Sequence, residues 1–138
     1  MFSQNQITSK ISFAGKEIIL PNSCKLFSDN EILYCDDYSI KWDYSESEKK
    51  INKKYNKEFN KIKSLNKIEK NKKVTMYSFD SSIEGEEIEV SLSDGPYYTY
   101  LLKGNINEYY TLIRIETVNQ IKNKSQLKGF ISNFISIN

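Results

Sequence analysis

Two pairs of adjacent carboxylic acids, Asp36–Asp37 and Glu86–Glu87, are the first residues in this sequence that could do chemistry. A glycosidase needs two carboxyl groups that face each other across a cleft, whereas neighbouring residues on a strand point to opposite faces of the sheet. The sequence has no histidine, which removes the common catalytic triads, histidine metal sites and imidazole acid–base catalysis. We therefore expect a protein that is not an enzyme and that holds no metal or cofactor.

The two cysteines, Cys24 and Cys35, flank a predicted hairpin whose two-residue turn is Asp29-Asn30. In the register that this turn sets, Cys24 lies opposite Cys35. Paired Cα atoms at a non-hydrogen-bonded site are about 4.5 Å apart, within the reach of a disulfide. We expect the two thiols to be bridged, and two buried free cysteines are the alternative. A disulfide favours an oxidising compartment.

Charge is segregated along the chain in two blocks. Residues 48–73 hold eleven Lys against three Glu, and residues 80–94 hold six Asp or Glu and no Lys. The acidic block predicts a patch that attracts a basic protein partner, such as a basic toxin or effector. Its candidate contacts are Glu86, Glu87 and Glu89, and a solvated hairpin is the alternative.

The lysines of the helix predicted over 46–64 indicate either a solvated helix face or a surface that binds nucleic acid or an anionic membrane. Arg114 is the only arginine, although arginine is the preferred residue for bidentate recognition of phosphates and base edges. The net charge of the whole chain, +2, is also small. Nucleic acid is therefore disfavoured as the partner, and binding of a polyanion stays the alternative.

Tyrosines gather on two adjoining predicted strands, 97–103 and 109–118. Because a strand alternates faces, Tyr97 and Arg114 are expected on one face and Tyr98 on the other. Tyrosine and arginine are enriched among the residues that dominate binding energy at interfaces. A second core layer is the alternative role for these aromatic rings. The candidate contacts from these strands are Tyr97, Tyr98, Tyr110 and Arg114.

Helical periodicity predicts two helices. Ser45 followed by Glu48 forms a capping box for a Lys-rich helix over 46–64. Residues 66–73 are predicted to be a polar linker. Ser125 is predicted to cap a final helix that has one apolar face, made by Leu127, Phe130, Ile131, Phe134 and Ile135.

Alternating apolar residues and turn signals predict strands before and between these helices. Turns are expected over 81–85, 93–96 and 104–107. The chain is therefore predicted to be α+β: an antiparallel sheet covered by a long mid-chain helix and a C-terminal helix, an α/β sandwich. The predicted strands are 11–13, 17–20, 23–27, 31–35, 38–44, 73–80, 86–92, 97–103 and 109–118.

The N-terminal residues 1–9 are predicted to be a flexible start to a single domain that spans 1–138. Phe2-Ser3-Gln4-Asn5 resembles the end of a bacterial secretory signal. We expect an extracytoplasmic protein, in the periplasm or cell envelope, with its native signal peptide removed, and a cytoplasmic protein is the alternative. No run approaches the roughly 18 apolar residues that a membrane helix needs.

The stretch Phe13-Ala14-Gly15-Lys16 followed by Glu17 to Pro21, together with the order of elements, resembles the PsbP/Mog1/DcrB-like superfamily of small α/β sandwiches. That resemblance implies a non-enzymatic binding role and carries over no functional residue. We expect a bacterial immunity protein that inhibits a secreted toxin, or an adaptor or chaperone for a secreted effector. A structural envelope subunit is a further alternative.

Overall fold

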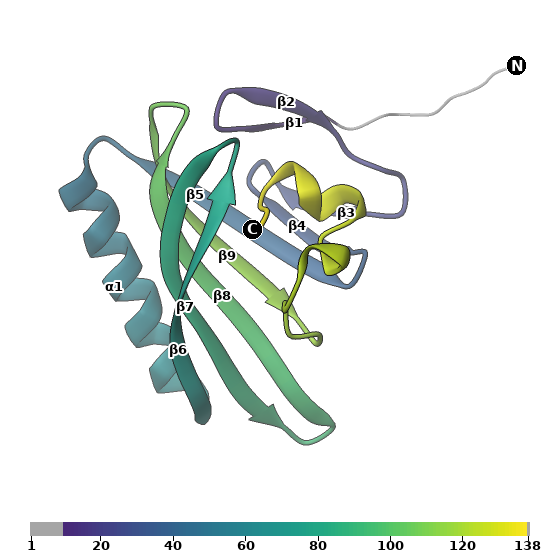
Figure 1. Ribbon diagram of the computed structural model, residues 1–138, viewed down its shortest axis with the longest axis vertical. Coiled ribbons are helices and arrows are strands. Elements are labelled where there is room, and N and C mark those ends of the chain that lie inside the picture. Colours follow the sequence, from purple (N-terminus) through teal and green to yellow (C-terminus); the bar gives the residue numbers. More distant parts are fainter. Residues whose placement is uncertain (1–9, 138) are drawn as a thin grey trace, which may run out of the picture.

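Seven antiparallel strands form the central sheet of the computed structural model, which describes residues 10–137 (Figure 1). The strand order is β3-β4-β5-β9-β8-β7-β6, and β1 and β2 form a separate hairpin. The α+β architecture with a long mid-chain helix is therefore confirmed. The strands and the helix are β1 (Lys10–Phe13), β2 (Lys16–Ile19), β3 (Lys25–Ser28), β4 (Glu31–Cys35), β5 (Tyr38–Ser45), α1 (Glu48–Leu65), β6 (Ile68–Ser78), β7 (Ser81–Leu92), β8 (Gly95–Ile106) and β9 (Tyr109–Thr117).

Helix α1 connects β5, in the middle of the sheet, to β6 at its edge and covers one face on the way (Figure 1). Ser47 caps its first turn, because its side chain accepts a hydrogen bond from the Lys50 N–H at 3.2 Å. The expected cap, Ser45, lies two residues earlier, at the end of β5. The helix and the sheet face beneath it share one apolar cluster, made by Ile51, Tyr55, Ile62, Ile88, Val90, Leu101 and Leu112.

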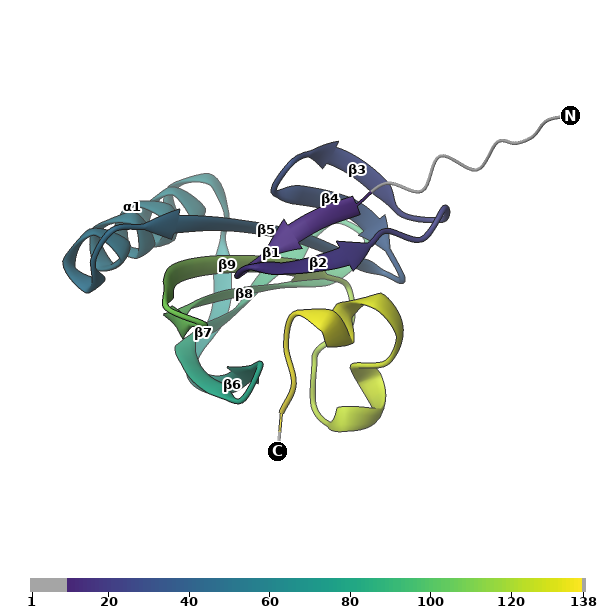
Figure 2. The same cartoon turned by 90° about the horizontal axis from the view of Figure 1, so that it is seen from above.

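The opposite face of the sheet is covered by the β1–β2 hairpin and the C-terminal segment (Figure 2). Phe13 of the hairpin and Phe134 of the C-terminal segment both pack on Trp42 of β5, with ring centroids 5.6 and 5.3 Å away. Such aromatic contacts add to the stabilisation from buried apolar area. The Ala14 N–H also donates to the Tyr44 hydroxyl at 2.7 Å, which ties the hairpin turn to the sheet.

The predicted C-terminal α-helix is wrong, because this segment forms only two 3₁₀ turns, Lys124–Gln126 and Gly129–Asn133. Gly129 has φ +76°, a left-handed conformation that interrupts an α-helix. A Cβ at this position would also meet the Asp36 carboxylate. The apolar residues predicted for this segment are nevertheless buried: Leu127, Phe130, Ile131, Phe134 and Ile135.

The predicted polar linker 66–73 and turn 81–85 are also wrong. Strand β6 begins at Ile68, and the turn to β7 is only Phe79-Asp80, whose φ angles are both positive. The lysines of β6 lie opposite the glutamates of β7 in the register Lys70↔Glu89, Lys72↔Glu87 and Lys73↔Glu86. Opposite charges on paired residues of neighbouring strands stabilise the sheet. This pairing explains why a segment as polar as the start of β6 forms a strand.

Candidate functional site

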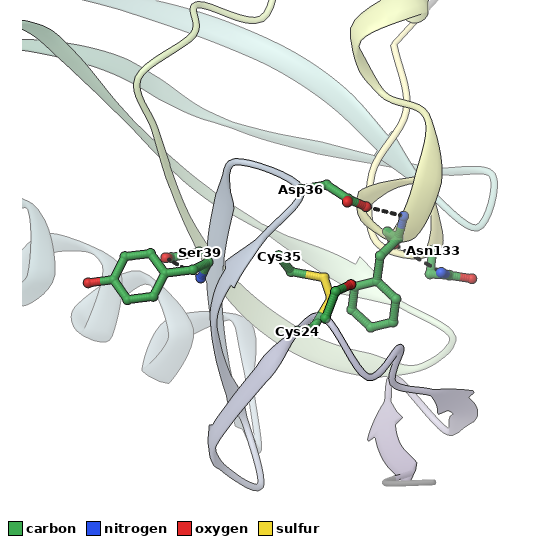
Figure 3. The surroundings of a disulfide bond; sticks show 8 residues. Cys24, Cys35, Asp36, Ser39 and Asn133 are labelled. Carbon is green, nitrogen blue, oxygen red and sulfur yellow. Dashed lines mark hydrogen bonds between the residues drawn. A yellow bond between two sulfur atoms is a disulfide. The ribbon is translucent and has the colours of Figure 1, made fainter. Parts of the chain in front are cut away.

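The predicted disulfide between Cys24 and Cys35 is present, with the two Cα atoms 4.5 Å apart (Figure 3). The register around it is less regular than a simple hairpin. Ser28 lies opposite Glu31 as expected, but a bulge then shifts the pairing to Leu26↔Ile32. A second irregularity, in β4 between Ile32 and Cys35, brings the two cysteines back together.

Tyr34 is the residue that this second irregularity turns outward. Its φ is +55°, in the left-handed region that a bulky aromatic residue rarely adopts, and it is 75% exposed. Its N–H donates to the Ser39 hydroxyl at 3.2 Å, and the next residue, Cys35, is fixed by the disulfide. A strained conformation held by its surroundings is typical of functional positions. Sequence reasoning missed Tyr34, since no local pattern signals the bulge.

The turn that follows the disulfide is held against the C-terminal segment. Figure 3 shows Asp36 pointing toward this segment, where its carboxylate accepts a hydrogen bond from the Phe130 N–H at 3.4 Å. The Tyr38 hydroxyl donates to the Gln126 carbonyl oxygen at 3.0 Å. The disulfide and these two contacts fix the end of the sheet at which Tyr34 is presented.

Three adjoining hollows, of about 320, 180 and 240 Å³, follow β5 and β9 on the face that carries α1. The first and second share Lys41 and Arg114, and the second and third share Ser39 and Glu116. They therefore adjoin one another in a row, and we call the three together the trough. Its floor is Ser39, Lys41, Arg114 and Glu116, and it runs from Lys57 on α1 to Tyr34 on β4.

The end of the trough beside α1 is basic. Its hollow is lined by five cationic side chains and only two anionic ones. Lys54 is paired with Asp43 at 2.9 Å and donates to the Tyr44 carbonyl at 2.8 Å. The cationic residues of this end are Lys41, Lys54, Lys57, Lys61 and Arg114.

Arg114 lies at the centre of the trough, between two carboxylates. Its guanidinium pairs with Glu58 of α1 and, at 3.1 Å, with Glu116 of its own strand. Burial alone would lower the pKa of Arg114, but these two carboxylates raise it above its ordinary value. Its Nε atom is buried without a hydrogen-bond partner among the described residues.

The other end of the trough combines aromatic and apolar side chains with polar ones. Tyr34, Tyr97 and Val118 line its hollow together with the carboxylates of Asp37 and Glu116, and Val118 is 59% exposed. Burial, reinforced by the Glu116 carboxylate, raises the pKa of the Tyr97 hydroxyl to about 12. Tyr97 is therefore neutral at physiological pH and offers a ring with a hydrogen-bonding tip.

The three glutamates predicted as an acidic contact patch lie elsewhere, and each has internal partners or neighbours. Glu86 lies under α1 and accepts a hydrogen bond from the Tyr55 hydroxyl at 2.8 Å. Glu87 is only 5% exposed, on the opposite face of the sheet. It accepts hydrogen bonds from Tyr100 and Gln120. Glu89 is half-buried on that same face, opposite Lys70 of β6 and Tyr98 of β8.

The remaining predicted contacts are split between the two faces, as strand alternation predicts. Tyr97, Tyr110 and Arg114 are on the α1 face, whereas Tyr98 is buried on the other. Tyr110 packs beside the first turn of α1, away from the trough. The structure therefore brings only Tyr97 and Arg114 together at the trough.

Within residues 10–137, no cluster of acidic or cysteine side chains has the arrangement of a metal site. Over the same range, no helix has both the length and the apolar character needed to cross a bilayer. The sequence matches no protein-family model and no curated protein.

Proposed function

We propose that this protein is a non-enzymatic binding module that recognises another protein through the trough. The observation that carries this proposal is the placement of Tyr34. A disulfide-linked, bulged strand holds the backbone of Tyr34 in a left-handed conformation, and its exposed ring therefore lies at the end of the trough. Nothing in the core needs the ring there, since it points away from the packed residues.

The trough has the composition that protein interfaces favour. Tyr34, Tyr97 and Arg114 belong to the residue types that most often dominate binding energy. Tyr34 has few rotatable bonds and a backbone already fixed by its neighbours, so it loses little entropy when a partner binds. The trough lies on a part of the α1 face that the helix leaves open, as does a hollow of about 430 Å³ on the other side of α1, whereas the hairpin and C-terminal segment cover the other face.

The disulfide supports a role outside the cytoplasm, because such bonds persist in oxidising compartments. A small extracytoplasmic binding module fits an immunity protein against a secreted toxin, or an adaptor or chaperone for a secreted effector. A structural envelope subunit uses the same kind of surface toward a fixed neighbour. The identity of the captured partner distinguishes these roles.

Affinity capture from the producing cells tests the proposal. The tagged wild-type protein is compared with Tyr34→Ser and with Phe27→Ser, a matched control at an exposed ring on the edge strand β3, outside the trough. We expect the wild type and Phe27→Ser to retain one dominant protein that Tyr34→Ser loses. Retention of the same protein by all three would show that the trough is not the contact surface.

A second function, binding of a polyanion, is favoured by the exposed lysines of α1, which include Lys49, Lys53 and Lys63. Such binding weakens steeply as salt rises. Gel-shift and liposome-pelleting assays at about 50 mM salt, where screening is mild, test this function. Failure to bind nucleic acid and anionic vesicles under these conditions would eliminate it.

A further inference from the structure

The geometry points to an extended, acidic segment of the partner as the occupant of the trough, with its carboxylates at the α1 end and an apolar side chain at the tyrosine end. This inference rests on the proposed function and specifies the chemistry of the partner. It reverses the sign of the partner charge that the acidic block of the sequence predicts.

The α1 end of the trough carries an excess of positive charge, which is the first argument. Lys54 is paired with Asp43, and Arg114 with Glu58 and Glu116. Lys41, Lys57 and Lys61 are exposed and form no salt bridge with any residue in the described part of the chain. Three ammonium groups around one concave hollow raise the local concentration of anions and steer an acidic partner toward it.

The direction of the trough is the second argument. It runs from Asp37, in the turn just before β5, to Asp43 on β5 at the helix end. The five strand steps from Tyr38 to Asp43 span about 17 Å. A partner segment of similar length, in an extended conformation, can therefore reach from one end to the other.

The aromatic end supplies the third argument. Tyr34 and Val118 are exposed around the same hollow, and Tyr97 closes one side of it. From Ser39, which lines this hollow, to Asp43 at the basic end is four strand residues, about 13 Å. An apolar partner side chain in this hollow would therefore be followed, about four residues along, by carboxylates that meet Lys41, Lys57 and Lys61.

The acidic strand β7 is less suited to attract a basic partner. Lysines of β6 lie opposite Glu86, Glu87 and Glu89, and Lys72 Nζ is 3.6 Å from the Glu87 carboxylate. These charges compensate one another within the sheet. At the basic end of the trough, Glu31 of β4 lies opposite Lys41, but Lys57 and Lys61 form no salt bridge with any described residue, so this end keeps an excess of positive charge.

Nuclear magnetic resonance titration with two synthetic peptides tests the inference. The first peptide carries one phenylalanine, three neutral spacers and four glutamates, and the second replaces the glutamates with lysines. We expect the glutamate peptide to shift the resonances of trough residues at low salt and the lysine peptide to leave them in place. The shifts should diminish as salt is raised toward physiological concentration, because screening weakens the ionic contacts.

Two charge-reversal variants on the same helix make the titration specific. Lys57→Glu with Lys61→Glu reverses the wall of the trough, and Lys49→Glu with Lys53→Glu makes the same charge change outside it. We expect the first pair to weaken binding of the glutamate peptide about tenfold more than the second. Heteronuclear spectra of both variants show whether they remain folded.

Equal binding of both peptides, equal effects of both variants, or shifts confined to another face would overturn the inference. Loss of the captured partner in Tyr34→Ser, together with its full retention by the Lys57→Glu and Lys61→Glu variant, would overturn the inference and leave the proposed function intact. A change in oligomeric state without peptide binding would identify a second copy of the chain as the occupant, which also contradicts it.

Discussion

Glu87 offers the sharpest test of whether the acidic strand stabilises the fold. Its carboxylate accepts a hydrogen bond from the Tyr100 hydroxyl at 2.7 Å and another from Gln120 Nε2 at 2.9 Å. The same Tyr100 oxygen accepts from the Ile121 N–H at 2.7 Å, so one tyrosine links β7 to the C-terminal segment. Glu87→Ala removes the acceptor at the centre of this network.

The expected cost follows from the burial of each partner. Tyr100 is fully buried, and Glu87 is the only acceptor for its hydroxyl hydrogen among residues 10–137, so losing it costs about 2 kcal/mol. The partly buried Gln120 adds about 1 kcal/mol. We therefore expect Glu87→Ala to lower the free energy of unfolding by about 3 kcal/mol. Glu87→Gln keeps the side-chain volume and a carbonyl oxygen for Tyr100, so its cost should be about 1 kcal/mol.

Urea denaturation followed by tryptophan fluorescence measures these values. Trp42 is the single tryptophan and is buried in the core, so its emission reports global unfolding. Glu89→Ala, two residues along the same face of β7, is the matched control and should change the free energy of unfolding by less than about 0.5 kcal/mol. If Glu87→Ala and Glu89→Ala cost the same, the assignment of Glu87 to the fold would be refuted.

Three further predictions concern the sheet and the trough. Reduction of the Cys24–Cys35 disulfide, which closes a loop with a sequence separation of 11, should lower the free energy of unfolding by about 3 kcal/mol in urea titrations, and an unchanged midpoint would contradict this. Tyr97 should ionise with a pKa of about 12 in an ultraviolet titration, above an ordinary tyrosine near 10. Because the native pKa of Tyr97 is raised, its neutral hydroxyl contributes to the free energy of unfolding below about pH 10, and this contribution is lost as pH rises toward 12. If the free energy of unfolding of a Tyr97→Phe variant falls equally at alkaline pH, Tyr97 is not the cause. Gly85→Ala should destabilise the protein by roughly 1–3 kcal/mol, since the new methyl would collide with the Leu101 carbonyl oxygen, and a wild-type melting temperature would show that the strands are not so close.

The sequence predicts the elements that sustain a regular pattern. In β5, for which the sequence predicts a strand over 38–44, Tyr38, Ile40 and Trp42 alternate with polar residues, and all three are buried. The apolar stripe of the mid-chain helix likewise lies against the sheet, with Ile51 and Ile62 buried. In both elements the local period matches the global packing, so a sequence argument suffices.

Strand β6 was not predictable in full, because its stability depends on another strand. Taken alone, Lys70, Lys72 and Lys73 resemble a solvated linker. Only the pairing with β7 places glutamates opposite them. Such cross-strand compensation is invisible until the topology is known.

The trough was beyond sequence reasoning for a similar reason. Tyr34 becomes an exposed ring at the end of the trough through a bulge, a left-handed backbone and the adjacent disulfide acting together. Tyr97 and Arg114 were selected from their residue types, but their proximity to Tyr34 comes from the order of strands β4, β5, β9 and β8. Residue type therefore identified two members of the site, and tertiary structure supplied its location.

Photo-crosslinking from position 34 tests most directly whether the trough contacts a partner. A photoreactive phenylalanine analogue replaces Tyr34 in one protein and Phe27 in the control, and both are irradiated in the producing cells. Both positions are exposed rings on the β3–β4 hairpin, but only Tyr34 lines the trough. We expect one specific protein to be cross-linked from position 34 and none from position 27. Equal cross-linking from both positions, or from position 27 alone, would contradict it.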